Sequence, residues 1–548
     1  MAGSGPALFE SDLSLLYPGD YLDLRPDGVA GSALSPYTWE QLEMDLLIDM
    51  QSCDAGDFFT DVPEVILYRQ EVFRDAVRHP ELTRALKKMI PLLCDIEDLR
   101  RMGSDSSHSA ESYLYSITEI ELYISVVTLL RDALAPLKDK LESRAFRELA
   151  DRITALTDSD YYKDLNKKLG ELTSRVREVK SVTIGVNLDG QLKASAAGLL
   201  SVNNEPFKSG ELLEKILRLD FRSDEMTCIA PLTPFDKNQS ENRRLAMSNA
   251  LYSALTDVFR SSVKSWKKIV SEYVLENTNF LLRMMPEIEL VTGGAELIAK
   301  LEKNGLHLTY PELTDALGGR DFEAAGLTNP VIKLKLDTPA VPNDLSFDED
   351  GMIYVLTGPN RGGKSVITCA AGIAFAMAGL GLPVCADSCR MSPCDGIFTH
   401  FPTGSDDTID KGRLGEECAR LEKILDQVTD RSLVLLDESF SSTGAYEASV
   451  IASEVLAGLS VIGCRTVFST HLHDLASSVG DINEKCEKLG GARVDTLVAE
   501  VGSDGSRSFR IKRERPDGKS YARDIAAKYG LSFGEILKKK GKEGTVEQ

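Results

Sequence analysis

The sequence has no excess of basic residues. Its 63 lysines and arginines stand against 85 aspartates and glutamates, which gives a formal net charge of −22 at pH 7. This balance argues against a protein coated in basic surface, but nucleic acid needs only a local basic stripe. Two groups of residues offer such a stripe, and a solvated helix face or a frayed tail is the favoured interpretation of each group alone: Lys167, Lys168, Arg175, Arg177 and Lys180, and Lys538, Lys539, Lys540 and Lys542.

A charged leader followed by an apolar stretch is also missing, so we expect no secretory signal. The ten cysteines form no paired framework and indicate reduced thiols in a cytoplasmic protein. Cys385, Cys389 and Cys394 lie close together but lack the CxxC spacing, so core thiols are favoured over a zinc site. Neither a repeat of fixed period nor a long low-complexity segment is evident.

One charge-free run, residues 369–386, has the length that a membrane span requires. It contains Gly379, Gly381 and Pro383 and directly follows a glycine-rich motif. A buried helix that runs into a buried strand explains the run better than a membrane span does. We therefore expect no membrane association.

The chain is too long for one ordinary core, so several domains are expected. Residues 1–38 are rich in Gly, Pro and Ser and are predicted to pack loosely, and residues 39–325 read mainly as helices. Residues 326–548 alternate short apolar runs with helical segments, a pattern typical of a mostly parallel sheet buried on both faces. The fold class is thus multidomain, with an α/β domain after a mainly helical region.

Within the helical region, residues 161–180 carry apolar residues at alternating spacings of four and three, which predicts a short coiled coil or helical hairpin arm: Leu165, Leu169, Leu172, Val176 and Val179. Alternation over 182–188, followed by Asp189-Gly190, predicts a β-hairpin. Residues 236–244 read as a polar connector, and residues 251–273 as a further long helix.

The α/β region contains a complete GxxxxGK[ST] motif, placed between an apolar strand at 353–356 and an apolar helix from Val366. In this motif glycines let backbone N–H groups curl around phosphates, and the helix N-terminus favours negative charge. We expect Lys364 to reach the β- and γ-phosphates and Ser365 to bind Mg²⁺. The predicted nucleotide-binding residues are Gly358, Pro359, Asn360, Arg361, Gly362, Gly363, Lys364, Ser365 and Val366.

Two further strand ends support this prediction. The apolar run 433–436 ends in Asp437-Glu438. A buried strand has little reason to end in two carboxylates unless a metal or a water lies there, so Asp437 is the predicted Mg²⁺ ligand and Glu438 the base that polarises water. The strand at 466–468 leads to His471, predicted to sense the γ-phosphate as the switch histidine of ABC-type ATPases does.

Taken together, these segments resemble the MutS family of DNA mismatch-repair ATPases. Residues 357–365 read TGPNRGGKS, close to the family's TGPNMGGKS. The segments that are similar to other family motifs are residues 342–344 (PND), 397–399 with 405–407, 432–438, 466–475 and 520–531. Weaker similarity extends upstream, where residues 66–70 resemble the family's I-x-x-RQ helix and residues 184–187 the strand that returns from its DNA clamp.

The resemblance implies a helical core and lever with an arm and small clamp at about 138–205. It also implies an ABC-type P-loop ATPase over 326–548, whose C-terminal helices dimerise. Family members form dimers in which each nucleotide lies between two ATPase domains.

The family's wedge domain and connector domain have no recognisable counterpart here. Phe146-Arg147-Glu148 fits the Phe-x-Glu letters but lies on a predicted helix. Gly412, Arg413, Leu414 and Gly415 stand where the family's signature has Ser-Thr-Phe-Met, which puts the contact to the partner's nucleotide and the turnover rate in question.

The predicted function is that of a dimeric, ATP-gated DNA clamp acting in mismatch repair or related recombination and repair, which reads DNA shape rather than mismatches. Its catalytic residues would be Glu438, Lys364 and His471, with ATP and Mg²⁺ as cofactors. The alternative is a nucleotide-gated scaffolding protein with low turnover that acts on RNA or ribosomes. An ABC transporter subunit is disfavoured, because the LSGGQ motif is absent and the upstream half is helical.

Overall fold

The computed structural model describes residues 13–26, 34–105, 110–177, 181–191, 194–203, 205, 208–209, 227–228, 275–314, 319–336, 340–402, 412–501, 507–515, 531, 535–536 and 539. Its contacts divide the chain into two compact units. The helical unit comprises Met1–Ser14 and His79–Ile288, and the sheet unit comprises Leu15–Arg78 and Glu289–Gln548. The family-domain limits at residues 38 and 325 stay predictions.

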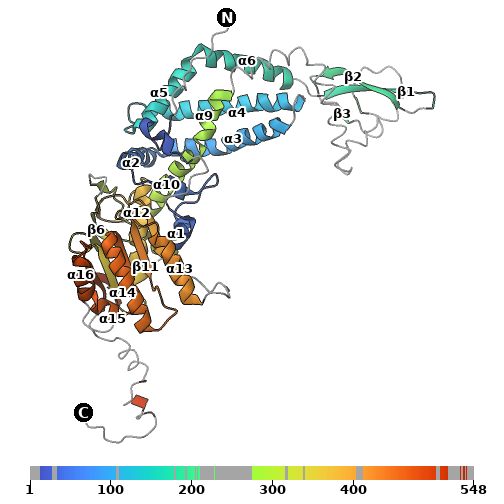
Figure 1. The fold of residues 1–548 in the computed structure, drawn as a ribbon. Coiled ribbons are helices and arrows are strands. Elements are labelled where there is room, and N and C mark those ends of the chain that lie inside the picture. The colour runs from blue at the N-terminus through green and yellow to red at the C-terminus, as the bar shows by residue number, and fades with distance from the viewer. Residues whose placement is uncertain are drawn as a thin grey trace, which may run out of the picture. The chain divides into compact units, whose positions relative to one another are not determined.

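Helices build most of the helical unit (Figure 1). They are α3 (Pro80–Asp105), α4 (Ala110–Leu134), α5 (Arg144–Asp158), α6 (Asp160–Arg177) and α9 (Leu275–Arg283). The hydroxyl of Ser143 caps α5 by accepting a hydrogen bond from the Phe146 amide at 3.4 Å. This bond satisfies an N–H of the first helical turn that has no partner within the helix. The helix predicted for the arm is confirmed: α6 packs against α4 and α5, and its Leu165 and Leu169 are buried.

The hairpin predicted after this helix is also confirmed. Strand β1 (Ser181–Leu188) pairs antiparallel with β2 (Ala194–Asn203), and Asp189-Gly190 lies in the turn. Two short strands, β3 (Lys208–Ser209) and β4 (Thr227–Cys228), pair in parallel. The predicted connector at 236–244 and the predicted helix at 251–273 lie outside the described residues.

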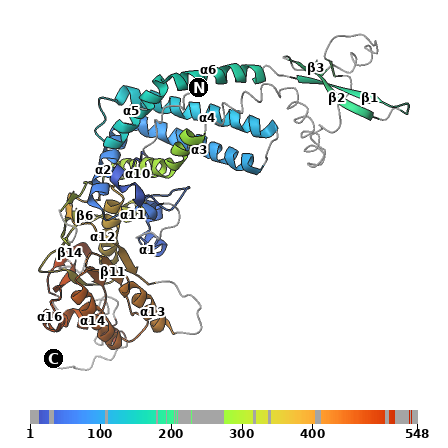
Figure 2. The same cartoon turned by 45° about the horizontal axis from the view of Figure 1, so that its top comes forward.

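A six-stranded sheet forms the centre of the sheet unit (Figure 2). Its strands are β8 (Ile353–Thr357), β10 (Ile397–His400), β11 (Leu433–Asp437), β12 (Arg465–Ser469), β13 (Val494–Val501) and β14 (Arg507–Arg513). Their order is β10-β11-β12-β8-β13-β14, with every pair parallel except β13–β14. Every residue of β8, β11 and β12 is buried, as expected for strands covered on both faces. The predicted parallel sheet is therefore confirmed.

Helices and a second sheet cover these strands. Helix α12 (Lys364–Gly379) packs against β10, β11 and β12, α13 (Arg413–Leu425) against β10, and α14 (Ala445–Ile462) against β8. The smaller helices here are α1 (Pro36–Gln41), α11 (Pro330–Lys335), α15 (His473–Ser477) and α16 (Val479–Glu487). A four-stranded sheet has the order β5 (Glu312–Leu313), β9 (Ser388–Met391), β6 (Phe322–Leu327) and β7 (Asn343–Phe347).

Two apolar segments of the sheet unit raise the question of a membrane. Residues 369–386 belong to α12 and to the chain that follows it, and nearly all of them are buried. Their bridge at Val384 is isolated, and the following strand, β9, starts only at Ser388. Helix α14 is the one described helix long and apolar enough to cross a bilayer, with a third of its residues buried. Those buried side chains, among them Leu456 and Leu459, face the protein interior.

The expectation that residues 1–38 pack loosely is wrong for residues 13–17, 34 and 38, which are buried, whereas the other described residues of this segment are exposed or half-buried. Leu15, Leu16 and Tyr17 are at most 2% exposed, and Thr38 donates a hydrogen bond to the carbonyl of Ile397 in β10. The glycines and prolines of this segment suggested an open chain, but Leu15, Leu16, Tyr17 and Leu34 are buried in the sheet unit. The upstream segment is therefore part of the framework around the central sheet.

Helix α2 (Pro63–Arg78) contains a buried arginine, Arg69, that connects the chain upstream of residue 79 to the rest of the sheet unit. Arg69, which is fully buried, donates hydrogen bonds to the carbonyls of Leu16, Phe58 and Gly379. Its guanidinium also lies 4.6 Å from the ring centroid of Tyr17. Because Gly379 ends α12, Arg69 joins the upstream segment to the far end of the helix that follows the glycine-rich motif. The arginine of the I-x-x-RQ motif is thus a packing residue.

Replacing Arg69 with Met should lower the free energy of unfolding by roughly 3 kcal/mol or more, because buried carbonyls lose their donors. Arg69→Lys should not restore stability, because one ammonium cannot reproduce the planar fork of donors. Denaturant unfolding measures the difference. The control is Arg493→Met at an exposed position of the same unit, where a change of about 0.5 kcal/mol or less is expected. An Arg69→Met variant as stable as this control would contradict the assigned role.

Candidate functional site

The predicted phosphate loop leaves the sheet at the carboxyl end of β8 and enters α12. Gly358 and Gly363 have φ angles of 140° and 95°, a region that side chains disfavour. A Cβ on Gly358 would lie 2.6 Å from the Cβ of Ala499 in β13, so this glycine is needed for both conformation and space. The loop is thereby held close to the sheet edge, with Lys364 as the first residue of α12.

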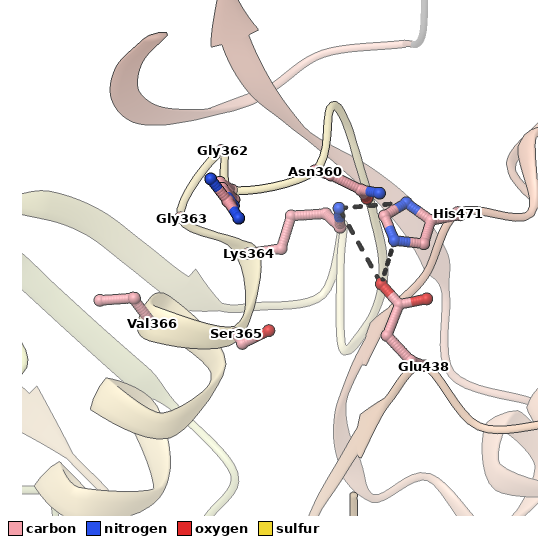
Figure 3. A pocket seen from close by; sticks show the side chains of 9 residues that line it. Asn360, Gly362, Gly363, Lys364, Ser365, Val366, Glu438 and His471 are labelled. Atoms are coloured by element: carbon pink, nitrogen blue, oxygen red, sulfur yellow. Dashed lines mark hydrogen bonds and ion pairs between the residues drawn. The ribbon is translucent and has the colours of Figure 1, made fainter. Parts of the chain in front are cut away.

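The predicted lysine, glutamate and histidine come together at this edge (Figure 3). Lys364 Nζ donates to the carbonyls of Gly358 (3.0 Å) and Pro359 (3.3 Å) and lies 4.0 Å from Glu438 Oε1. His471 Nε2 lies 2.8 Å from the same Glu438 oxygen, and His471 Nδ1 lies 3.4 Å from Lys364 Nζ. The three side chains form one cluster, although each follows a different strand.

Strand order explains this convergence. β12 lies between β8 and β11, all three are parallel, and so their carboxyl ends share one edge. Glu438 is fixed there in a left-handed conformation (φ 48°), with its amide bonded to the Ser469 carbonyl at 2.8 Å. Such a backbone costs on the order of 1–3 kcal/mol and persists where the surroundings determine it. The carboxylate is therefore aimed by the fold.

The cluster borders a cavity of about 380 Å³. Its lining consists of Asn360, Arg361, Gly362, Gly363, Lys364, Ser365, Val366, Glu438 and His471. In the close view Asn360 lies beside His471, whereas the side chain of Val366 points away from the cluster (Figure 3). Seven of the nine predicted nucleotide-binding residues thus line one cavity, and the other two, Gly358 and Pro359, present carbonyls to Lys364.

Burial makes the charges of this site unusually costly. It lowers the pKa of Lys364 from its ordinary value, opposed by the nearby charges of Glu438 and Asp437. It also raises the pKa of Asp437, opposed by the hydroxyls of Ser365 and Ser469. A ligand that brings its own balanced charges, such as a metal-bound polyphosphate, would relieve both penalties.

The donor set at Asp437 fits Mg²⁺. The hydroxyls of Ser365 and Ser469 lie near the carboxyl group, but Asp437 Oδ1 and Ser469 Oγ are buried without a hydrogen-bond partner in the described chain. A hydroxyl oxygen and a carboxylate oxygen with free lone pairs are the ligands that this ion prefers. Among described residues, no group of three or more His, Cys, Asp or Glu side chains is arranged to hold a metal.

The remaining sequence candidates lie elsewhere. Gly412 is the exposed N-cap of α13 and makes no side-chain cap. Phe146 is fully buried in α5, so Phe146-Arg147-Glu148 presents no wedge.

Cys385, Cys389 and Cys394 are buried, and burial raises the pKa of each thiol to about 12. Lys168 pairs with Asp164 on α6 at 2.6 Å, as a solvated helix face would. Residues 405–407 and 520–530 lie outside the described residues.

Several residues near the site escaped the sequence analysis. Arg507 in β14 lies near enough to Lys364 to lower its pKa, and Phe509 approaches Gly363 from the same strand. Ser469, at the end of β12, lies beside Asp437. His400 hydrogen-bonds Ser439, the residue after Glu438. His400 and Ser439 directly follow recognised motifs and Ser469 lies within one, whereas the sequence carried no signal for Arg507 and Phe509.

Two known protein-family domains match most of the chain. Residues 61–304 match the MutS2 N-terminal domain, and residues 354–527 match MutS domain V, the domain of an ATPase family. The DNA mismatch repair protein MutS of Synechococcus sp. (strain CC9605) is 35% identical over 38% of this chain and 24% of that protein. MutS of Roseiflexus sp. (strain RS-1) is 36% identical over 50% and 26%, and Msh6 of Gallus gallus is 41% identical over 25% and 11%. The chain spans about a quarter or less of the length of these relatives.

Proposed function

Because the chain belongs to the MutS family, we propose that it is an ATPase whose nucleotide site is the cavity beside Lys364, Glu438 and His471. The observation that carries the proposal is the meeting of three strand ends: the phosphate loop after β8, Asp437-Glu438 after β11 and His471 after β12. Such convergence at one sheet edge places a cation, a base and a polar sensor around one phosphate group.

Each residue has a role that its position supports. Backbone N–H groups of residues 358–363 and the ammonium of Lys364 would bind the β- and γ-phosphates. Ser365 and Asp437 would hold Mg²⁺, which neutralises phosphate charge when bound. Glu438 would take a proton from the attacking water, and His471, 2.8 Å from Glu438, would orient that carboxylate or contact the γ-phosphate.

Lys364→Ala should abolish ATP binding, because the charge on the phosphates is lost. Glu438→Gln should retain binding but slow hydrolysis by about 100-fold or more, because it removes the base and keeps the shape of the side chain. Equilibrium binding of a fluorescent ATP analogue and steady-state phosphate release separate the two effects. Activity should vanish with EDTA and return with Mg²⁺. If Glu438→Gln hydrolyses ATP at the parental rate, Glu438 is not the base.

We further propose that two copies of the chain form the working ATPase, as the family resemblance implies. The first residues of α13 support this, because Gly412 and Arg413 are exposed and thus accessible to a second copy. The signature serine is replaced here by glycine, whose backbone N–H would have to make the contact.

Glu438→Gln should sediment as a dimer with ATP and Mg²⁺ and dissociate when ATP is omitted, because an unhydrolysed nucleotide keeps the composite site closed. Sedimentation velocity at several protein concentrations is the measurement, with Lys364→Ala as the control that cannot respond to ATP. Only monomers of Glu438→Gln under saturating ATP would contradict the composite site.

The proposed ligand of the ATP-gated clamp is DNA, in mismatch repair or related recombination and repair, because the matched relatives are named DNA mismatch repair proteins. We propose that it reads DNA shape. The described hairpin offers hydroxyl, amide and aliphatic groups from β1 and β2, and neither strand contains an aromatic residue that would act as a wedge. Nothing in the matches favours RNA or ribosomes. The proposed location is the cytoplasm.

Affinity for DNA should fall steeply with salt and differ by less than about tenfold, or 1.4 kcal/mol, between a duplex with one G·T mismatch and its matched counterpart. The reason is that phosphate contacts carry no sequence information. Competition binding at equal duplex length and stated salt measures the ratio, with Holliday-junction and RNA ligands as further competitors. Stronger mismatch discrimination would reveal a base-reading element, and preferential RNA binding would contradict the DNA assignment.

A further inference from the structure

A buried histidine, His400, lies next to the proposed ATPase residues and has no role assigned by the motifs. It is the last residue of β10, pairs with Leu436 in β11, and is 2% exposed. Its Nδ1 lies 2.7 Å from the hydroxyl of Ser439, and its Nε2 lies 3.2 Å from the carbonyl of Glu417 in α13. One imidazole therefore bridges the residue after Glu438 and a backbone carbonyl of α13.

The chemistry of the two contacts fixes the tautomer. A carbonyl only accepts hydrogen bonds, so Nε2 must carry the proton that it shares with Glu417. Burial lowers the pKa of His400 to about 4, so the ring is neutral near pH 7 and Nδ1 has a free lone pair. Ser439 therefore donates to Nδ1. Its hydroxyl also lies 3.2 Å from the His400 carbonyl, a second acceptor for the same proton.

The contact acts on a constrained turn. Glu438 and Phe440 both have positive φ angles, 48° and 66°, on either side of Ser439. The Glu438 amide is held by Ser469, and the fully buried Phe440 ring lies 6.4 Å from the His400 ring, centroid to centroid. Two non-glycine residues in the left-handed region require fixed neighbours. His400 supplies the side-chain bond between those two anchors.

The geometry points to His400 as a positioning residue that, through Ser439, holds the Glu438 carboxylate in line for hydrolysis and links it to α13. This inference rests on the proposed ATPase function, with Glu438 as the base. It also connects α13, whose N-cap is the exposed Gly412, to the base through the side chains of His400 and Ser439. A shift of α13 would therefore reach Glu438 by way of His400 and Ser439.

Two substitutions separate the two contacts. The amide of His400→Asn occupies the place of Nδ1 and can still accept from Ser439, whereas that of His400→Gln occupies the place of Nε2 and can donate only to Glu417. His400→Gln should lower kcat about 10- to 100-fold with KM and ATP-analogue affinity within about twofold, because a small misplacement of a base costs rate rather than binding. His400→Asn should retain kcat within about threefold, because it keeps the positioning bond. Ser439→Ala should behave like His400→Gln.

If His400 had only a structural role, its substitution would lower stability without the predicted difference in kcat between His400→Gln and His400→Asn. The decisive measurement is therefore a double-mutant cycle with Glu438→Gln. If His400 acts through Glu438, adding His400→Gln to Glu438→Gln should produce no further loss in single-turnover hydrolysis. His307→Gln, at a histidine 80% exposed in the same unit, is the matched control and should leave kcat unchanged.

Parental kcat in both His400→Gln and Ser439→Ala would overturn the inference, and so would an equal loss in the parental and Glu438→Gln backgrounds. If His400→Gln does not fold, Ser439→Ala and its own cycle with Glu438→Gln decide the question. Failure of the ATPase assignment looks different, because the parental protein would then show no hydrolysis or Glu438→Gln would not slow it.

Discussion

The parallel pairing of β12 between β8 and β11 is the constraint on which the site depends. Each strand ends in a different motif, and parallel pairing brings the three ends to one edge. The amide of Glu438 bonds to the end of β12, and the amide of Thr470 bonds to Leu356 at the end of β8. The same ladder that forms the core therefore sets the spacing of Lys364, Glu438 and His471.

The loop after β8 also depends on residues far upstream. Helix α12 begins with Lys364 and ends at Gly379, whose carbonyl accepts hydrogen bonds from Arg69 and from the amide of Thr60. Arg431, just before β11, pairs with Asp61 at 2.6 Å. Residues 15–78 thus brace the helix that presents the phosphate loop. These contacts join two separate chain segments, Leu15–Arg78 and Glu289–Gln548, in one compact unit.

Electrostatics gives the site its direction. A buried lysine with a lowered pKa faces a buried aspartate with a raised pKa, and each is held away from water by the protein around it. Asp437 Oδ1 has no hydrogen-bond partner in the described chain. Burying these two charged groups costs free energy, and a ligand with the complementary arrangement of charges reduces that cost when it binds. That property is what makes the cavity suited to a metal-bound nucleotide.

The sequence by itself determined the local structures: the strands at 353–356 and 433–436, the hairpin at 182–188, a helix within 161–180 and a glycine-rich loop between a strand and a helix. These follow from periodicity, turn chemistry and motif spacing, which act over a few residues. Composition misjudged the buried residues of the N-terminal segment, because glycine and proline content does not indicate which leucines are buried in a core. Only the tertiary structure placed Arg69 against Gly379, 310 residues away, and His400 against Ser439, 39 residues away. Such contacts arise from strand order and side-chain packing, and neither leaves a local pattern in one sequence.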